Sequence, residues 1–116
     1  MRKLVVALAL GLGCGTADPV EDQCTNAPTY SADLLPGVVT RACLSCHSET
    51  KVGRVARQSA PDGMDFDRFE LVTEPGGLAD SITSGRMPPP SLDPPNPTTM
   101  EEREQVSLWR KCGFRR

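Results

Sequence analysis

The sequence predicts an all-α domain of three to four short helices joined by long, proline-rich loops. Apolar residues recur at three- and four-residue spacing between residues 31 and 42 and between residues 99 and 111, as they do along the buried face of a helix. Eleven prolines interrupt the 116 residues, and proline breaks helix interiors. We therefore expect loops over residues 49–63, with at most a short helix, and over residues 88–97.

The first helix is expected over residues 31–42. Its apolar stripe consists of Leu34, Leu35, Val38, Val39 and Ala42. Pro36 is expected in the first turn, because an interior proline costs a helix about 3 kcal/mol. This helix would deliver Cys43 at its C-terminal end.

Two short helices are expected next. Asp65 is the predicted N-cap of the first, which places Phe66, Phe69 and Val72 on one face and ends at residues 75–77. The second covers residues 78–84, and Gly85 fits the left-handed conformation that often ends a helix.

The last helix has the clearest boundaries. Thr99 and Glu102 have the spacing of a capping box, the helix runs to about Lys111, and Gly113 is expected to end it. Its buried stripe consists of Val106, Trp109 and Cys112.

The N-terminus has the pattern of an export signal. Arg2 and Lys3 precede an uncharged apolar run over residues 4–13, which is too short for a membrane span and fits a signal peptide over residues 1–13. The following Cys14 resembles the acylated cysteine of bacterial lipoproteins; ordinary signal cleavage nearby is the alternative. The prediction is an exported protein, lipid-anchored to a bacterial membrane and facing the periplasm or the cell exterior, with residues 14–29 as a tether.

Cys43-Leu44-Ser45-Cys46-His47 matches the C-x-x-C-H pattern of covalent haem attachment. Two thiols add to the two vinyl groups of haem, and the adjacent imidazole binds the iron. His47 is the single histidine of the chain. The alternatives are a redox disulfide or half of a zinc site, but a structural zinc site needs four Cys or His ligands. No internal repeat is present, so one haem c per chain is expected.

A second axial iron ligand is expected among the four methionines, because electron-transfer haems usually have both positions filled. Met87 lies between a predicted helix end and three prolines, in an extended strap suited to hold a sulfur against the haem. Met64 is interpreted as a filler of the apolar core and Met100 as a packing residue. An open or exogenous sixth position is the remaining alternative.

Cys24 and Cys112 remain once Cys14 is assigned to lipid and Cys43 and Cys46 to haem. An oxidising compartment makes a disulfide between them the natural pairing, with two unpaired thiols as the alternative. Removing residues 1–13 changes the formal charge from −2 to −4, because Arg2 and Lys3 are lost with no acidic residue. This mild acidity argues against nucleic acid as a partner.

Together these segments, from about Tyr30 to Gly113, resemble small class I cytochromes c and the cytochrome c-like domains of exported lipoproteins, and we expect a monohaem cytochrome c domain over residues 30–116. The resemblance implies thioether bonds from Cys43 and Cys46, His47 as proximal ligand and Met87 as distal ligand. It also implies that the last helix crosses the first. The glycine and aromatic residue that often meet at this crossing have Gly37 and Trp109 as candidates here.

The function expected from this resemblance is one-electron transfer by a monohaem cytochrome, not enzymatic catalysis. Its partners would be donor and acceptor redox proteins, with no small-molecule substrate. The alternative is a haem enzyme or gas sensor, such as a small peroxidase, with an open or displaceable sixth ligand. The absence of a second histidine counts against it.

Several other residues have two interpretations. Trp109 either packs or donates to a haem propionate, and Tyr30 either caps the haem edge or packs. Each of three arginines either pairs with a propionate or is solvated: Arg54, Arg57 and Arg86. Three acidic residues are interpreted as caps and turns, because they lack the spacing of a calcium loop: Asp62, Asp65 and Asp67.

Overall fold

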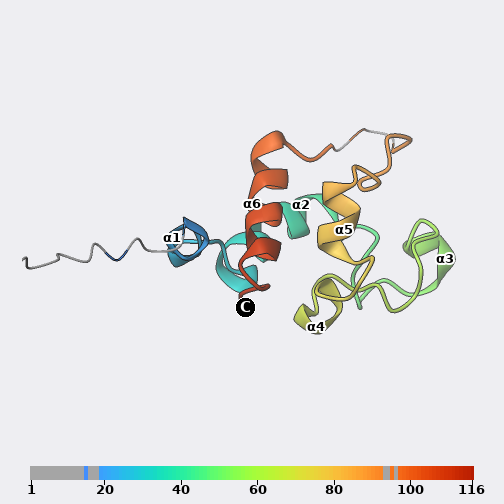
Figure 1. The fold of residues 1–116 in the computed structure, drawn as a ribbon. Helices are drawn as coiled ribbons and strands as arrows, with labels where there is room; N and C mark the ends of the chain where they lie inside the picture. Colours follow the sequence, from blue (N-terminus) through green and yellow to red (C-terminus); the bar gives the residue numbers. More distant parts are fainter. Residues whose placement is uncertain (1–14, 16–18, 93–94, 96) are drawn as a thin grey trace, which may run out of the picture.

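The computed structural model describes residue 15, residues 19–92, residue 95 and residues 97–116. These residues form helices and loops and contain no β-strand, which confirms the all-α class (Figure 1). The helices are α1 (Pro19–Thr25), η1 (Tyr30–Val39), α2 (Thr40–Ala42), α3 (Gly53–Ala56), α4 (Phe69–Val72), α5 (Leu78–Thr83) and α6 (Met100–Lys111). The predicted signal peptide and Cys14 lie outside the described residues.

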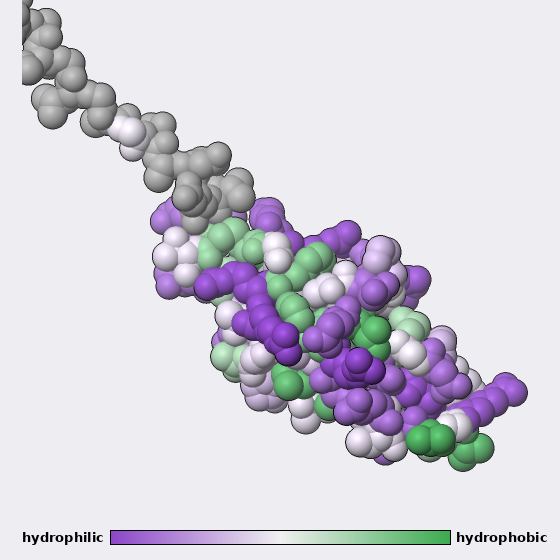
Figure 2. Space-filling model, turned by 90° about the horizontal axis from the view of Figure 1, so that it is seen from below, coloured by the Kyte–Doolittle hydropathy of each residue, from purple (hydrophilic) through white to green (hydrophobic). Residues whose placement is uncertain are grey.

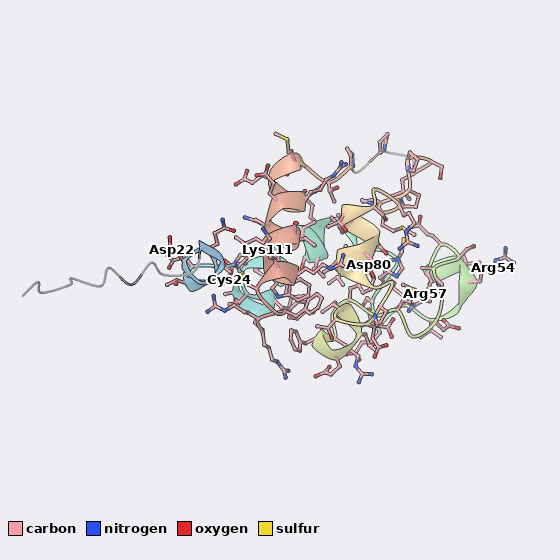
Figure 3. All side chains as sticks on the ribbon, in the orientation of Figure 1. Asp22, Cys24, Arg54, Arg57, Asp80 and Lys111 are labelled. Carbon is pink, nitrogen blue, oxygen red and sulfur yellow. A yellow bond between two sulfur atoms is a disulfide. The ribbon has the colours of Figure 1, made fainter. Side chains whose placement is uncertain are left out.

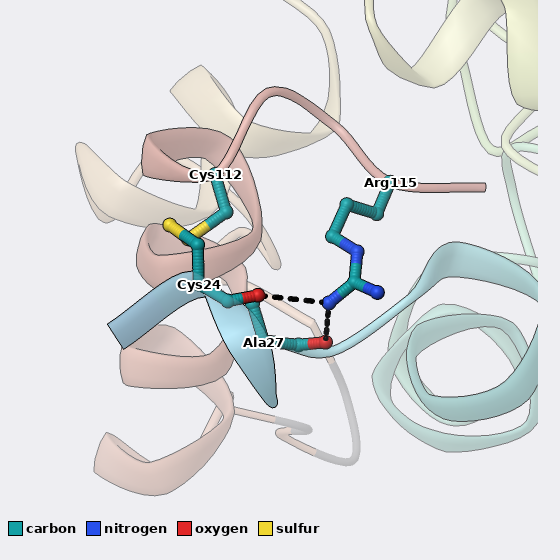
Figure 4. The surroundings of a disulfide bond; sticks show 4 residues. All are labelled: Cys24, Ala27, Cys112 and Arg115. Carbon is teal, nitrogen blue, oxygen red and sulfur yellow. Dashed lines mark hydrogen bonds between the residues drawn. A yellow bond between two sulfur atoms is a disulfide. The ribbon is translucent and has the colours of Figure 1, made fainter. Parts of the chain in front are cut away.

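Helix α1 lies within the segment expected to be a tether, so part of that segment is helical. Figure 1 places α1 beside the end of α6 where the chain terminates. The disulfide between Cys24 and Cys112 joins the two helices, with the Cα atoms 5.4 Å apart (Figure 4). The guanidinium of Arg115 donates to the carbonyls of Cys24 and Ala27, each at 3.0 Å. These contacts fix α1 to the C-terminal end of the chain.

The first helix of the domain is broken, unlike the regular helix that the sequence predicts. The Thr29 hydroxyl caps η1 by accepting from Ala32 N, and Pro36 lies in the second half of η1 instead of its first turn. The backbone leaves helical geometry at Gly37 (φ −92°, ψ −113°), one residue after the proline that cannot donate a hydrogen bond. Thr40 restores a partner for the Leu35 carbonyl through its hydroxyl and its N–H.

The hydrophobic core lies where α6 packs against η1 and α5. Trp109 and Val106 of α6 are completely buried, as is Leu34 of η1. Gly37 does not form the glycine–aromatic contact expected at this crossing, because it is exposed and a Cβ atom there would meet nothing within 4 Å. The two helices therefore meet through side chains and not through a close backbone approach.

The predicted boundaries of α6 are confirmed. Thr99 and Glu102 form a full capping box, with Glu102 N donating to the Thr99 hydroxyl and Thr99 N donating to the Glu102 carboxylate. Gly113 takes a left-handed conformation (φ +79°) directly after the helix. Glu102 also pairs with Arg41 of α2, so the start of α6 is attached to the segment that precedes Cys43.

The predicted helix at residues 65–72 is shorter than expected. It begins at Phe69, and no side chain caps it. The Asp65 carboxylate is instead engaged by the guanidinium of Arg57 at 2.7 Å, so the predicted N-cap role of Asp65 is wrong. After α4, Gly77 lies so close to the preceding turn that a Cβ atom would be 2.8 Å from the Glu74 carbonyl oxygen. Gly85 has φ +72° at the end of α5, as its predicted C-cap role requires.

Exposed apolar side chains are few among the described residues. Figure 2 shows apolar atoms at the end of the molecule remote from the grey chain, which is the end where Figure 1 places α3. Val52 and Val55 are 82% and 92% exposed there. Met100 is 78% exposed on α6, so its expected packing role is wrong. No helix within the described ranges is long and apolar enough to cross a membrane.

Candidate functional site

The C-x-x-C-H segment continues the turn that α2 begins. Cys43 N donates to the Val39 carbonyl at 2.9 Å, and His47 N donates to the Cys43 carbonyl at 2.9 Å. This turn gathers the three side chains of the motif at one cavity. The local hydrogen bonds therefore account for the placement that the spacing predicts.

The cavity has a volume of about 340 Å³, within the usual range of about 300–1,000 Å³ for ligand and cofactor sites. Cys43, Cys46 and His47 contribute to its wall, and Met87 contributes from the strap after α5. Most of the remaining lining is apolar and includes Ala42, Phe66, Leu78, Ile82, Pro88, Pro89 and Leu92. The structure thus brings all four predicted haem residues to a single apolar cavity.

His47 is oriented by contacts on its far side. Its Nδ1 atom is 3.0 Å from the Met64 carbonyl oxygen, so Nδ1 carries the proton and donates. The ring stacks on Phe66 at 4.6 Å between centroids. Nε2 makes no hydrogen bond with the described residues. Every fully buried side-chain nitrogen among these residues has a partner, so Nε2 is not fully buried. It is open to the cavity that His47 lines.

The protonation of His47 suits a metal ligand. Burial lowers the pKa of its imidazole, an effect that the hydrogen bond to Met64 partly offsets and the positive charge of Arg57 reinforces. A neutral imidazole with a free Nε2 is the form that binds metals. The site therefore presents a ligand that needs no deprotonation at neutral pH.

The two thiols of the motif are unpaired in the structure. Cys43 is buried, and burial raises the pKa of its thiol to about 12. Redox-active C-x-x-C pairs work through a thiolate with a lowered pKa. A buried, neutral Cys43 thiol is the reverse of that arrangement and does not favour the redox-disulfide interpretation.

Residues 65–67 clamp the chain that leaves the motif, a role that sequence reasoning missed. Phe66 N donates to the His47 carbonyl at 2.8 Å. The Asp67 carboxylate accepts from the Ser48 hydroxyl at 2.6 Å and from Glu49 N at 3.1 Å. The clamp holds His47 from its backbone side as well as from its ring.

Arg57 is the second residue whose role sequence reasoning missed. The sequence suggests a solvated arginine in a polar loop, yet its side chain is only 3% exposed. Its guanidinium donates to Asp65 and to backbone carbonyls on both sides of the loop, including Ser48 and Pro61. The convergence of these carbonyls depends on the folded loop and has no local sequence signal.

The methionine strap is held against α5. Met87 N donates to the Ser81 carbonyl at 3.1 Å, and Pro88 and Pro89 line the same cavity. Met64 is half-buried against the core, in agreement with its predicted role. Met87 is therefore the methionine that the structure places at the cavity, whereas Met100 lies exposed on α6.

The remaining candidates lie away from the cavity lining. Trp109 packs in the core and donates from its indole to the Arg115 carbonyl at 2.6 Å. Tyr30 is buried and donates from its hydroxyl to the Phe66 carbonyl at 2.6 Å. Arg54 and Arg86 are exposed and donate to the Ser59 and Ser84 hydroxyls respectively.

Comparisons with protein-family models, with curated proteins and with solved structures found no match to this chain. Within the described part of the chain, no group of three or more His, Cys, Asp or Glu side chains is placed to hold a metal ion.

Proposed function

We propose that this protein is a monohaem c-type cytochrome with a cytochrome c-like fold, which carries single electrons between redox proteins. The observation that carries the proposal is the cavity shared by Cys43, Cys46, His47 and Met87. Two unpaired thiols, a neutral imidazole with a free nitrogen and a thioether are the donor set that a covalent haem with His/Met ligation requires. The residues present fit haem c.

Each residue has a distinct role in this proposal. Cys43 and Cys46 would form the two thioether bonds, His47 would bind the iron through Nε2, and Met87 would supply the distal sulfur. When bound, the haem supplies the one-electron Fe(III)/Fe(II) couple. The apolar lining would exclude water from the iron, and together with thioether ligation this would favour Fe(II) and raise the reduction potential.

The proposed setting is the periplasm or the outer cell surface of a bacterium. Residues 1–13 are the proposed signal peptide and Cys14 the lipid-anchored residue, followed by a tether that includes α1. Donor and acceptor proteins would meet the haem at its exposed edge. This assignment needs no small-molecule substrate and no nucleic acid.

Two measurements on the exported protein test the haem proposal. The intact mass reports haem, lipid and disulfide together, and we expect one haem with both cysteines modified. The optical spectrum should not change with carbon monoxide, because Met87 occupies the sixth position. Ready CO binding at neutral pH would favour the haem enzyme or gas sensor, and a colourless mature protein would falsify the proposal.

The distal ligand is tested by Met87→Ala. We expect this variant to bind CO and to have a lower reduction potential, because the thioether that favours Fe(II) is lost. Met100→Ala is the matched control, because Met100 is 78% exposed on α6 and should leave the spectrum unaltered. An unchanged spectrum in Met87→Ala would refute its role as ligand.

A further inference from the structure

Arg57 has an unusual environment for a residue of a polar surface loop. It lies directly after the four-residue helix α3 and is 2% exposed. Its donors reach the carboxylate of Asp65 and five backbone carbonyls, which belong to Ser48, Lys51, Ala60, Pro61 and Met64. The rigid, planar fork of donors in arginine suits such a cluster, and lysine cannot reproduce it.

Two of these contacts lead directly to His47. The Ser48 carbonyl, 3.1 Å from Arg57 Nη1, belongs to the residue that follows His47. The Met64 carbonyl, 3.4 Å from Arg57 Nη2, also accepts the proton of His47 Nδ1 at 3.0 Å. Arg57 and His47 therefore share one acceptor oxygen, and Arg57 fixes the loop that carries it.

We infer that Arg57 is a positioning residue that fixes the acceptor of the proximal histidine's Nδ1 proton, and that its buried charge raises the reduction potential of the haem. The acceptor of a histidine ligand's second nitrogen controls its tautomer and its basicity. A charge-assisted bond from Arg57 holds the Met64 carbonyl oxygen in place, so Nδ1 keeps its proton and its acceptor while Nε2 stays free.

The charge of Arg57 is the part that acts on the reduction potential. A buried cation disfavours the extra positive charge of Fe(III), and the effect is screened less than at the surface. Asp65 lies 2.7 Å from Arg57 and offsets part of this charge, whereas Asp62 is 91% exposed at 3.5 Å and is largely solvated. Removing Arg57 would leave the half-buried Asp65 carboxylate without its cation, which favours Fe(III) further.

The effect of Arg57 on the iron rests on the proposed haem function, but its effect on the histidine does not. His47 is the only histidine, so ¹⁵N-histidine labelling of the mature protein gives one pair of ring-nitrogen signals with no assignment problem. In the wild-type protein, measured in the reduced state if haem is present, we expect a proton on Nδ1 that exchanges slowly with solvent. Rapid exchange of this proton in the wild type would overturn the inference.

Arg57→Gln should speed exchange of the Nδ1 proton by at least about tenfold. It should also shift the Fe(III)/Fe(II) equilibrium about tenfold towards Fe(III), which is about 59 mV for one electron. The matched control is Arg54→Gln, because Arg54 lies one turn earlier, is exposed and donates to the Ser59 hydroxyl (Figure 3). This control should change neither quantity.

Arg57→Lys separates position from charge and decides the question if Arg57→Gln does not fold. Lysine keeps the cation but lacks the fork, so Nδ1 exchange should still be faster while the potential falls by less than in Arg57→Gln. A wild-type exchange rate and potential in either folded variant would refute the inference. A colourless protein would instead refute the haem proposal, and the ring-nitrogen signals would still decide the role of Arg57.

Discussion

The side of the molecule around the disulfide and the side around the cavity are built from different contacts. On the disulfide side, η1 and α6 cross through completely buried residues such as Leu34, Val106 and Trp109. On the cavity side, residues 48–65 contain only the four-residue helix α3, and polar contacts to one arginine hold them together. The first side has its own apolar core, whereas the second surrounds a space.

This difference indicates how the domain combines stability with a cofactor site. Apolar burial stabilises the helix crossing by about 1.5–3 kcal/mol for each large side chain, without any contribution from a ligand. The loops around the cavity gain little of this stabilisation until the cavity is filled, so their order depends on Arg57, on the 65–67 clamp and on the occupant. Local opening should therefore begin on the cavity side.

Removing the disulfide should cause the largest loss of stability, and it should act on the disulfide side of the molecule. The double variant Cys24→Ser/Cys112→Ser opens a loop with a sequence separation of 88 residues, for which the chain-entropy model gives about 4–5 kcal/mol of lost stability. Denaturant unfolding of this disulfide-free variant, compared with the wild type, measures the loss. The optical spectrum, which reports on the cavity, should stay as in the wild type. An unchanged unfolding midpoint would contradict the prediction.

Asp67→Ala should weaken the cavity side alone. It removes the carboxylate that accepts from Ser48 and Glu49. Each hydrogen bond to a charged group contributes about 1.5–3 kcal/mol to stability. Amide exchange of Glu49 should become faster, while exchange of the buried Trp109 indole stays slow. Equal acceleration at both positions would show that the two sides open together.

The smallest expected effect is that of Glu102→Gln, which keeps the capping geometry of α6 and removes the charge opposite Arg41. Burial raises the pKa of Glu102, but the bonds from Arg41 and from Thr99 N outweigh it and lower the pKa below its usual 4.5. The charged pair stabilises the fold above this pH and is lost as the pH falls through the lowered pKa. We expect the variant to be about 0.5–1 kcal/mol less stable at pH 7.

The pH dependence of the Glu102→Gln difference is its control. Urea unfolding at a series of pH values should show the two proteins converging as the pH falls below 4.5. A difference that stays constant down to the lowest pH would mean that the charge of Glu102 does not stabilise the connection between α2 and α6.

Features with a local physical cause were predictable from the sequence. The capping box of α6 and the left-handed Gly85 and Gly113 depend on neighbouring residues, and the structure has all three. The gathering of Cys43, Cys46 and His47 follows from one turn of backbone hydrogen bonds. Met87 was singled out by its position between a helix end and prolines, and the structure places it at the same cavity.

Features that depend on distant parts of the chain were not predictable. The break at Gly37 reflects competition between Pro36 and the apolar stripe of η1, which periodicity does not resolve. Asp65 has the sequence signature of a cap but is engaged by Arg57, a residue that itself looks solvated in sequence. α1 was missed because its segment is rich in the small and polar residues of a linker, and its fixed position comes from contacts with Cys112 and Arg115.

The bond between Cys24 and Cys112 also determines what a protease can release. A single cut anywhere between these residues, including the proline-rich segment after α5, leaves one cysteine on each fragment. The two pieces would migrate together on a gel without reductant and separate only after thiol treatment. The domain therefore tolerates a nick in its loops without losing either part of its chain.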